Sequence, residues 1–118
     1  MENRNSTEEG SGRKVSRQPV ERMVTRQTLA EKRTEILRLA DARCVGEVRV
    51  FGSVARGDST PGSDVDFLVR PLPKCSLFDL GGLLMDLQDL LGCEVDVVTQ
   101  EGLQPSLRQR VVAEAVPV

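Results

Sequence analysis

Apolar side chains recur at every third or fourth position in three stretches of the chain, and this spacing predicts amphipathic helices. The three predicted helices are 28–43, 76–91 and 105–115. Thr28 with Glu31, and Ser76 with Asp79, have the spacing of capping boxes at the starts of the first two helices. Gly92 is placed to end the second helix, whose predicted buried face consists of leucines. These leucines are Leu77, Leu80, Leu84, Leu87 and Leu91.

Three other stretches are short and rich in β-branched residues, which predicts strands. Residues 47–51 alternate polar and apolar side chains and end at Gly52, where a sharp turn is expected. Residues 65–70 end near two prolines, and residues 93–99 follow the second helix. The predicted order is therefore helix, strand, loop, strand, helix, strand, helix, without an internal repeat.

The chain divides by composition at about residue 27. Residues 1–27 carry six basic and four acidic side chains and few apolar ones, which predicts a disordered tail. Residues 28–118 carry the remaining ten basic and fourteen acidic side chains and are predicted to form one domain. No stretch approaches the roughly 18 apolar residues of a membrane-spanning helix, and the start is too polar for a secretory signal. A cytoplasmic protein without membrane contact is expected.

The sequence of 118 residues contains no histidine, which removes the Ser-His and Cys-His nucleophile pairs. Any catalysis would depend on carboxylates, lysines or metal ions. Cys44, Cys75 and Cys93 are widely spaced and form no CxxC pair, so they are interpreted as small core residues rather than zinc ligands or disulfides. Without Trp or Tyr, and with a net charge of −2, the chain is not expected to bind nucleic acid directly.

The loop between the first two predicted strands is rich in glycine and serine. Gly52 and Gly57 lack a Cβ, so backbone N–H groups there could approach an anion closely. The Ser53 hydroxyl could add a further donor to phosphate oxygens, especially if a short helix begins at this point. Taken alone, the loop is interpreted more simply as a turn, because glycine and serine are common in turns.

Three aspartates change that interpretation. Asp64 and Asp66 are two residues apart at a predicted strand, so both side chains are expected on one face, about 7 Å apart. Asp96 stands between two valines of the third predicted strand, where an unpaired charge would be costly. If that strand aims Asp96 at the same face, three carboxylates would lie beside the loop and suit Mg²⁺, as in two-metal nucleotidyl or phosphoryl transfer. In the alternative, Asp64 caps a turn and Asp96 faces solvent. Asp66 would then pair with an arginine such as Arg49.

The motif Gly52-Ser53, ten residues, then Asp64-Val65-Asp66 resembles the signature of the DNA polymerase β-like nucleotidyltransferase superfamily. The longer pattern Gly-Ser-x-Ala-Arg-Gly, followed by Ser-Asp-x-Asp-Phe, is similar to the minimal nucleotidyltransferases, the antitoxins of HEPN-MNT toxin-antitoxin pairs. Residues 90–92, 94–98 and 114–116 resemble the helix end, the third-aspartate strand and the closing segment of these proteins. The resemblance covers 29–118 and implies an α/β (α+β) fold, a polymerase β-like core with a small mixed sheet flanked by helices.

The resemblance also implies a role for each residue of the motif. Gly52 and Ser53 would hold the triphosphate of ATP. Asp64 and Asp66 would bind two Mg²⁺ ions. Asp96 would complete the site as a metal ligand or as the base for the acceptor hydroxyl.

Two further residues of the motif, Arg56 and Ser63, are expected near the nucleotide; Arg56 would contact phosphate or form a salt bridge within the fold. The implied reaction is transfer of AMP from ATP to a tyrosine of a cognate HEPN ribonuclease toxin, with which the chain would form a heteromeric complex. The sequence has no tyrosine, so self-modification at tyrosine is excluded.

Two alternatives remain open at this point. A nucleotidyltransferase acting on a small molecule, such as an aminoglycoside, would share the core but would usually carry an added substrate domain. A non-catalytic antitoxin would neutralise the toxin by binding alone and would not need the three aspartates.

Overall fold

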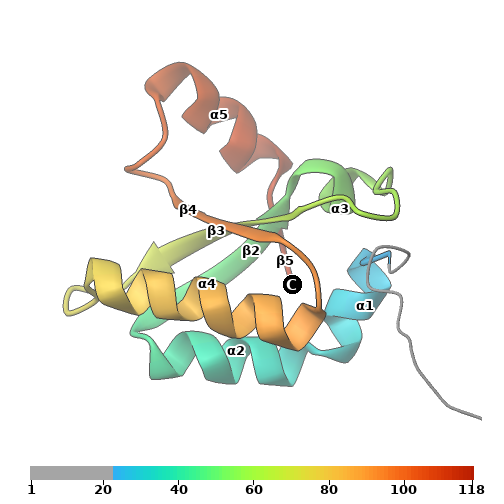
Figure 1. Cartoon of the computed structure of the whole chain (residues 1–118). Coiled ribbons are helices and arrows are strands. Elements are labelled where there is room, and N and C mark those ends of the chain that lie inside the picture. Colours follow the sequence, from blue (N-terminus) through green and yellow to red (C-terminus); the bar gives the residue numbers. More distant parts are fainter. Residues whose placement is uncertain (1–22) are drawn as a thin grey trace, which may run out of the picture.

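The structure, a computed structural model, describes residues 23–118 as a mixed four-stranded sheet with helices on both sides (Figure 1). The strands are β2 (Val45–Phe51), β3 (Val65–Pro71), β4 (Val95–Thr99) and β5 (Val116–Pro117). Their order across the sheet is β4-β3-β2-β5. β2 runs antiparallel to β3 and β5, whereas β3 and β4 are parallel. The predicted α/β class with a small mixed sheet is confirmed.

The helices are α1 (Arg26–Glu31), α2 (Arg33–Ala42), α3 (Gly52–Arg56), α4 (Leu77–Leu91) and α5 (Pro105–Glu114). Figure 1 shows α2 and α4 on one side of the sheet, with α3 and α5 on the other. The main core lies on the first side, where Ile36 of α2 and Leu87 of α4 pack with Phe67 of β3 and are fully buried. The opposite face of the sheet carries Asp66 and Asp96 together with the buried Leu68.

The first predicted helix is two helices, α1 and α2, and its predicted cap was wrong. Thr25, rather than Thr28, is the N-cap of α1, and its hydroxyl accepts the Thr28 N–H at 3.2 Å. The Thr28 hydroxyl accepts the Thr25 N–H in return, also at 3.2 Å. The Thr28 hydroxyl thus accepts the N-cap N–H, as a Glu or Gln side chain does in the usual capping box. The observed box lies three residues earlier than the predicted box of Thr28 and Glu31. Lys32 separates the two helices.

The start of the described chain packs against the core. Val24 is buried, and Thr25 caps α1, so these two residues, which precede the predicted boundary at 28, are part of the fold. The remainder of the predicted tail, residues 1–22, lies outside the described residues.

The second predicted helix is confirmed as α4, but one of the leucines predicted on its buried face is exposed to solvent. Its capping box is present, with the Ser76 N–H donating to Asp79 at 2.9 Å, and Gly92 ends it with φ 70°. Leu87 is buried, whereas Leu77 is 84% exposed, so the prediction that Leu77 belongs to the buried face was wrong. At 3.6 residues per turn, Leu77 lies roughly 80° around the helix from Leu87, at the first position of the helix.

The three cysteines are half-buried and form no disulfide within the described residues. Cys75 and Cys93 pack against the core, in line with their interpretation as small core residues. Burial raises the pKa of the Cys75 thiol, with smaller contributions from Asp79 and Cys44. In residues 23–118 no helix has the length and apolar character needed to cross a membrane.

Candidate functional site

The open face of the sheet brings two of the three aspartates together. β3 and β4 are parallel, and Asp66 pairs in register with Asp96. Residues paired in register project from the same face of a sheet. Phe67, the next residue of β3, points to the opposite face and is fully buried in the core. The prediction that the third strand aims Asp96 at the face of Asp66 is therefore confirmed.

The expectation that Asp96 carries a costly unpaired charge in the interior was nevertheless wrong. β4 is an edge strand, and Asp96 is exposed, so water solvates its charge and no partner is needed to bury it. Asp64 is also exposed and lies one residue before β3 begins, as the predicted strand bounds of 65–70 imply. Solvent exposure of Asp96 agrees with one part of the alternative, whereas the pairing of Asp66 with Arg49 is not found. Arg49 lies 3.6 Å from Glu47 and is not paired with Asp66.

The three carboxylates form a cluster of negative charge. Partial burial raises the pKa of Asp66, and the neighbouring charges of Asp96 and Asp64 raise it further. Arg56 acts in the opposite direction, but its effect is smaller. None of the three carboxylates accepts a hydrogen bond from another residue of the described chain, so their lone pairs are available to a ligand. A cation placed among them would relieve the repulsion.

The cluster fits a divalent cation only with help from other ligands. Within residues 23–118, no three acidic or cysteine side chains are arranged so that they could hold a metal ion by themselves. Mg²⁺ is usually bound by one or two carboxylates together with water and substrate phosphates, rather than by a complete protein cage. The residues present fit that mode of binding. The three-aspartate metal site stays a prediction.

The Gly52–Ser53 turn lies directly against this cluster. β2 ends at Phe51 and α3 begins at Gly52, whose φ of 75° favours glycine. A Cβ at Gly52 would collide with the carboxylate of Asp66, which shows how closely the backbone approaches that side chain. The backbone carbonyl of Ser53 accepts the Gly57 N–H at 3.0 Å, whereas the Ser53 hydroxyl has no hydrogen-bond partner in the described chain. The turn was predicted, and the structure explains why position 52 requires glycine.

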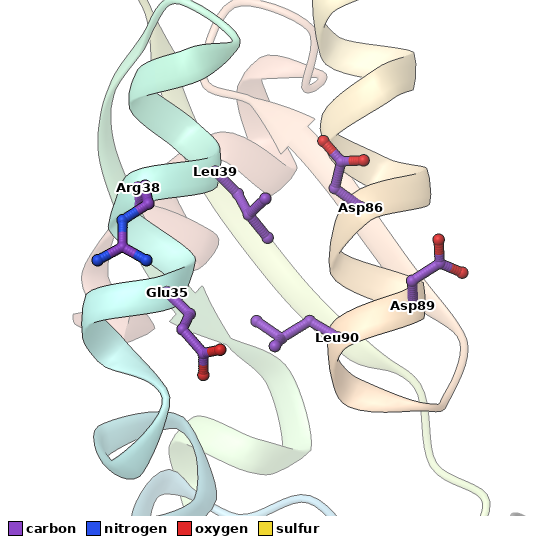
Figure 2. A pocket seen from close by; sticks show the side chains of 6 residues that line it. All are labelled: Glu35, Arg38, Leu39, Asp86, Asp89 and Leu90. Atoms are coloured by element: carbon purple, nitrogen blue, oxygen red, sulfur yellow. The ribbon is translucent and has the colours of Figure 1, made fainter.

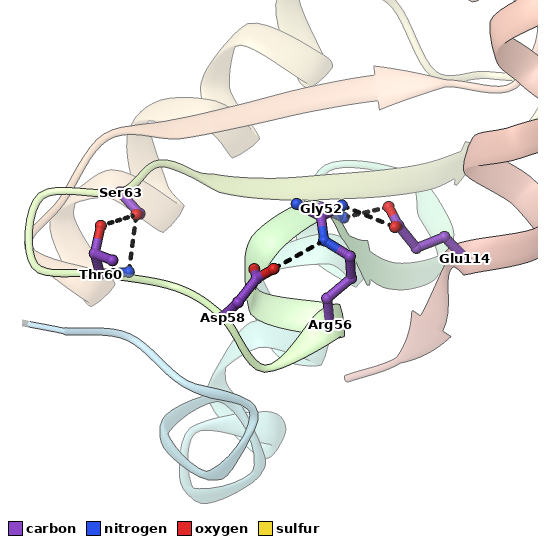
Figure 3. A network of polar contacts seen from close by, with 6 residues as sticks. All are labelled: Gly52, Arg56, Asp58, Thr60, Ser63 and Glu114. Atoms are coloured by element: carbon purple, nitrogen blue, oxygen red, sulfur yellow. Dashed lines mark hydrogen bonds and ion pairs between the residues drawn. The ribbon is translucent and has the colours of Figure 1, made fainter.

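Arg56 and Glu114 form the polar network beside the turn (Figure 3). Arg56 pairs with Glu114 at 2.8 Å and with Asp58 at 3.3 Å. The second oxygen of Glu114 accepts the Gly52 N–H at 2.8 Å. Arg56 holds the pKa of Glu114 below its usual range, with the Gly52 hydrogen bond adding to this effect. Of the two roles predicted for Arg56, the salt bridge is observed and the phosphate contact stays a prediction.

Sequence reasoning missed Glu114 as a residue of this region. The available signal was the short strand that follows it, because Val116 pairs with Val50 in antiparallel register. Continuing that register by two residues brings Glu114 opposite Gly52. The segment 114–116 resembled a family closing segment, but two residues of strand are too short to recognise from sequence alone.

Ser63 lies in a tight turn away from this network. Its hydroxyl accepts the Thr60 N–H at 3.0 Å, and its own N–H donates to the Thr60 carbonyl at 2.9 Å (Figure 3). The turn precedes Asp64 and leads the chain into β3. A contact between Ser63 and nucleotide stays a prediction.

A groove of about 380 Å³ lies between α2 and α4 (Figure 2). Its lining includes Glu35 and Arg38 on α2, and Asp86 and Asp89 on α4. These helices cover the core face of the sheet, whereas Asp66 projects from the opposite face. The groove is therefore separate from the carboxylate cluster.

This architecture is that of the polymerase β-like nucleotidyltransferases: a mixed sheet, a strand that ends in a Gly-Ser turn, and aspartates on the open face. Residues 29–118 match the nucleotidyltransferase domain family. The chain belongs to this family, within the group of minimal nucleotidyltransferases.

Two archaeal relatives are similar over most of their own length. The protein adenylyltransferase MntA of Thermococcus cleftensis is 39% identical over 74 residues, which cover 63% of this chain and 75% of that protein. A protein of Methanocaldococcus jannaschii provisionally named protein adenylyltransferase MJ0435 is 42% identical over 74 residues, covering 63% and 80%.

Solved structures give the same fold. A protein provisionally described as a minimal nucleotidyltransferase superposes with a TM-score of 0.73 and 41% identity, covering 80% of this chain and 97% of that one. A toxin-antitoxin complex with AMP-PNP contains a chain with a TM-score of 0.61 and 23% identity, covering 71% and 69%. The second likeness shows the fold alone.

Proposed function

We propose that the chain is a Mg²⁺-dependent protein adenylyltransferase that acts as an antitoxin. It would transfer AMP from ATP to a tyrosine hydroxyl of a cognate HEPN ribonuclease toxin, with which it forms a complex. The relatives named protein adenylyltransferase support the AMP transfer. Toxin-antitoxin complexes of the same fold, one of them with AMP-PNP, support a toxin partner and a nucleotide substrate. The proposed place of the reaction is the cytoplasm.

One observation carries the proposal: Asp66 and Asp96 pair in register on the open face, with the Gly52 backbone against the Asp66 carboxylate. This arrangement supports the proposal, because a glycine turn suited to binding an anion lies beside a pair of carboxylates. Nucleotidyl transfer needs positioning and charge stabilisation rather than a protein nucleophile. A chain without histidine can supply both.

The proposed step joins the acceptor oxygen to the α-phosphorus of ATP as the bond to pyrophosphate breaks. The electron pair of that bond leaves with pyrophosphate. Asp96, exposed at the sheet edge, takes the proton of the acceptor hydroxyl. The Ser53 hydroxyl and the N–H groups of the turn hold the triphosphate.

The free carboxylates of Asp64, Asp66 and Asp96 would hold the metal ions together with phosphate oxygens. A bound divalent ion lowers the pKa of the acceptor hydroxyl and neutralises charge on the phosphates. The acceptor tyrosine must belong to the partner, because this sequence contains none.

The test follows label from ATP to the purified toxin, using ATP labelled at the α or the γ phosphate. We expect α label alone to reach the toxin, and none after EDTA treatment until Mg²⁺ is restored. Asp64→Asn should reduce the rate by about 100-fold or more, since a metal ligand is lost. Asp89→Asn, which removes the same charge from the groove on the other side of the sheet, should leave the rate unchanged.

Other patterns of label contradict the proposal. Transfer of γ label would indicate a kinase. With no label from either position, toxin inhibition that survives Asp64→Asn would indicate an antitoxin that acts by binding alone. Transfer to an aminoglycoside instead would indicate a small-molecule nucleotidyltransferase. If a Tyr→Phe substitution in the toxin leaves α label unchanged, the acceptor is a different residue.

A further inference from the structure

We infer that Glu114 is a positioning residue, which holds the Gly52–Ser53 turn in the place where it can bind the triphosphate. The inference rests on the proposed function for its effect on ATP, but its structural part can be tested without activity. Glu114 touches neither Asp66 nor Asp96 through a hydrogen bond, so it acts through the turn rather than on the reacting atoms.

The two oxygens of Glu114 clamp both ends of α3. One oxygen accepts the Gly52 N–H at 2.8 Å, at the first residue of that helix. The other accepts from the Arg56 guanidinium at 2.8 Å, at the last residue. A helix of five residues has few internal hydrogen bonds, so its position depends on outside contacts: the burial of Val54 in the core and the Glu114 clamp at its two ends. Figure 3 shows the Glu114 side chain reaching from α5 toward both partners.

The sheet explains why Glu114 reaches this point. β5 pairs with β2 through Val116 opposite Val50, and two residues beyond this pair Glu114 accepts the Gly52 N–H. The end of α5 is thereby attached to the end of β2, where the turn begins. The attachment comes from β2, β5 and α5, whereas Asp66 and Asp96 lie on β3 and β4.

The position of the turn matters because little space separates it from Asp66. An added Cβ at Gly52 would already meet the Asp66 carboxylate. Any tilt of α3 therefore changes both the direction of the N–H groups and the room available to this aspartate. Preorganised donors lose their value for binding once they must be reordered by the ligand.

The experiment compares two substitutions of Glu114 in the full chain. Glu114→Ala removes both contacts, whereas Glu114→Gln keeps an oxygen that can accept the Gly52 N–H. For Glu114→Ala we expect KM for ATP to rise about tenfold and kcat to change by less than about threefold, because binding is lost rather than chemistry. For Glu114→Gln we expect KM to stay within about threefold of the wild-type value.

A second measurement needs no enzymatic activity. Hydrogen exchange of the Gly52 amide, followed by NMR without nucleotide, should accelerate about tenfold or more in Glu114→Ala and little in Glu114→Gln. Asp58→Asn is the matched control, because it removes the other carboxylate partner of Arg56 without touching Gly52. It should leave both KM and the exchange rate at wild-type values.

The outcomes separate this inference from the proposed function. If Glu114→Ala lowers the melting temperature but leaves KM and Gly52 exchange unchanged, Glu114 is merely structural and the inference is overturned. Equal defects in Glu114→Ala and Glu114→Gln would overturn it in favour of the Arg56 salt bridge. If the wild-type chain transfers no label, the proposed function fails, while Gly52 exchange still decides the clamp. Should Glu114→Ala not fold, Glu114→Asp replaces it, because the shorter side chain cannot reach both partners.

Discussion

Replacing Gly52 by alanine tests the close approach between the turn and the Asp66 carboxylate on the open face of the sheet. Gly52 has φ 75°, a conformation that costs an L-residue about 1–2 kcal/mol. The new Cβ would also collide with the Asp66 carboxylate. Gly57 is a matched control, since its φ is 83° and no atom lies within 4 Å of the place a Cβ would take.

The two substitutions share the backbone cost and differ in the collision. Gly57→Ala should destabilise the domain by about 1–2 kcal/mol. Gly52→Ala carries the same cost and, in addition, about 1–3 kcal/mol for overpacking. Since about 1 kcal/mol lowers the melting temperature of a domain this size by roughly 4–8 °C, the two variants should be clearly separated.

Thermal unfolding followed by circular dichroism measures both losses. A double-mutant cycle with Asp66→Ala then isolates the contact, because removing the carboxylate should reduce the cost of Gly52→Ala to that of Gly57→Ala. Equal losses for Gly52→Ala and Gly57→Ala, with no coupling to Asp66, would refute the reasoning. In that case the carboxylate moves aside freely, and the turn is not held against it.

Further predictions concern charge and helix propensity. Because the pKa of Asp66 is raised in the folded state, its contribution to stability is lost as pH rises through that pKa. Asp66→Asn should therefore be more stable than wild type at neutral pH, with the difference vanishing below the ordinary pKa of aspartate; a difference independent of pH in urea titrations would count against this. Gly81→Ala should stabilise α4 by about 1 kcal/mol, because no atom lies within 4 Å of its Cβ position. Gly82→Ala should stabilise α4 much less, because its Cβ would displace Arg43 from its 3.0 Å pair with Asp86. Equal melting temperatures for Gly81→Ala and Gly82→Ala would contradict this prediction.

The sequence was sufficient where a common short-range signal decides the structure. The Ser76–Asp79 box and the glycine after α4 are such signals, and both were found. The shared face of Asp66 and Asp96 could be anticipated because a strand residue projects from one of only two faces. The Thr25 cap was missed because a hydroxyl at the third helical position is a rarer partner than a carboxylate.

The parts that sequence could not supply depend on long-range pairing. Asp96 was expected in the interior because its neighbours are valines, but β4 is at the edge of the sheet. The order of strands in a sheet cannot be inferred from the sequence of a single strand. Glu114 lies 62 residues from its partner Gly52, and only the pairing of β5 with β2 brings them together. Arg56 had two possible roles because its partner was unknown.

Asp66 is in an environment that is unfavourable for a charged carboxylate. Asp66 has a raised pKa from burial and like charges, accepts no hydrogen bond from the described chain, and lies against a glycine with positive φ. Burial and like-charge repulsion at Asp66 lower stability without a ligand, and a divalent cation with a triphosphate would relieve the repulsion among the carboxylates. A protein that binds such a ligand in the folded state gains stability from it in proportion to the logarithm of ligand concentration. ATP with Mg²⁺ should therefore raise the melting temperature of wild type far more than that of Asp66→Asn, even though the apo variant is the more stable of the two.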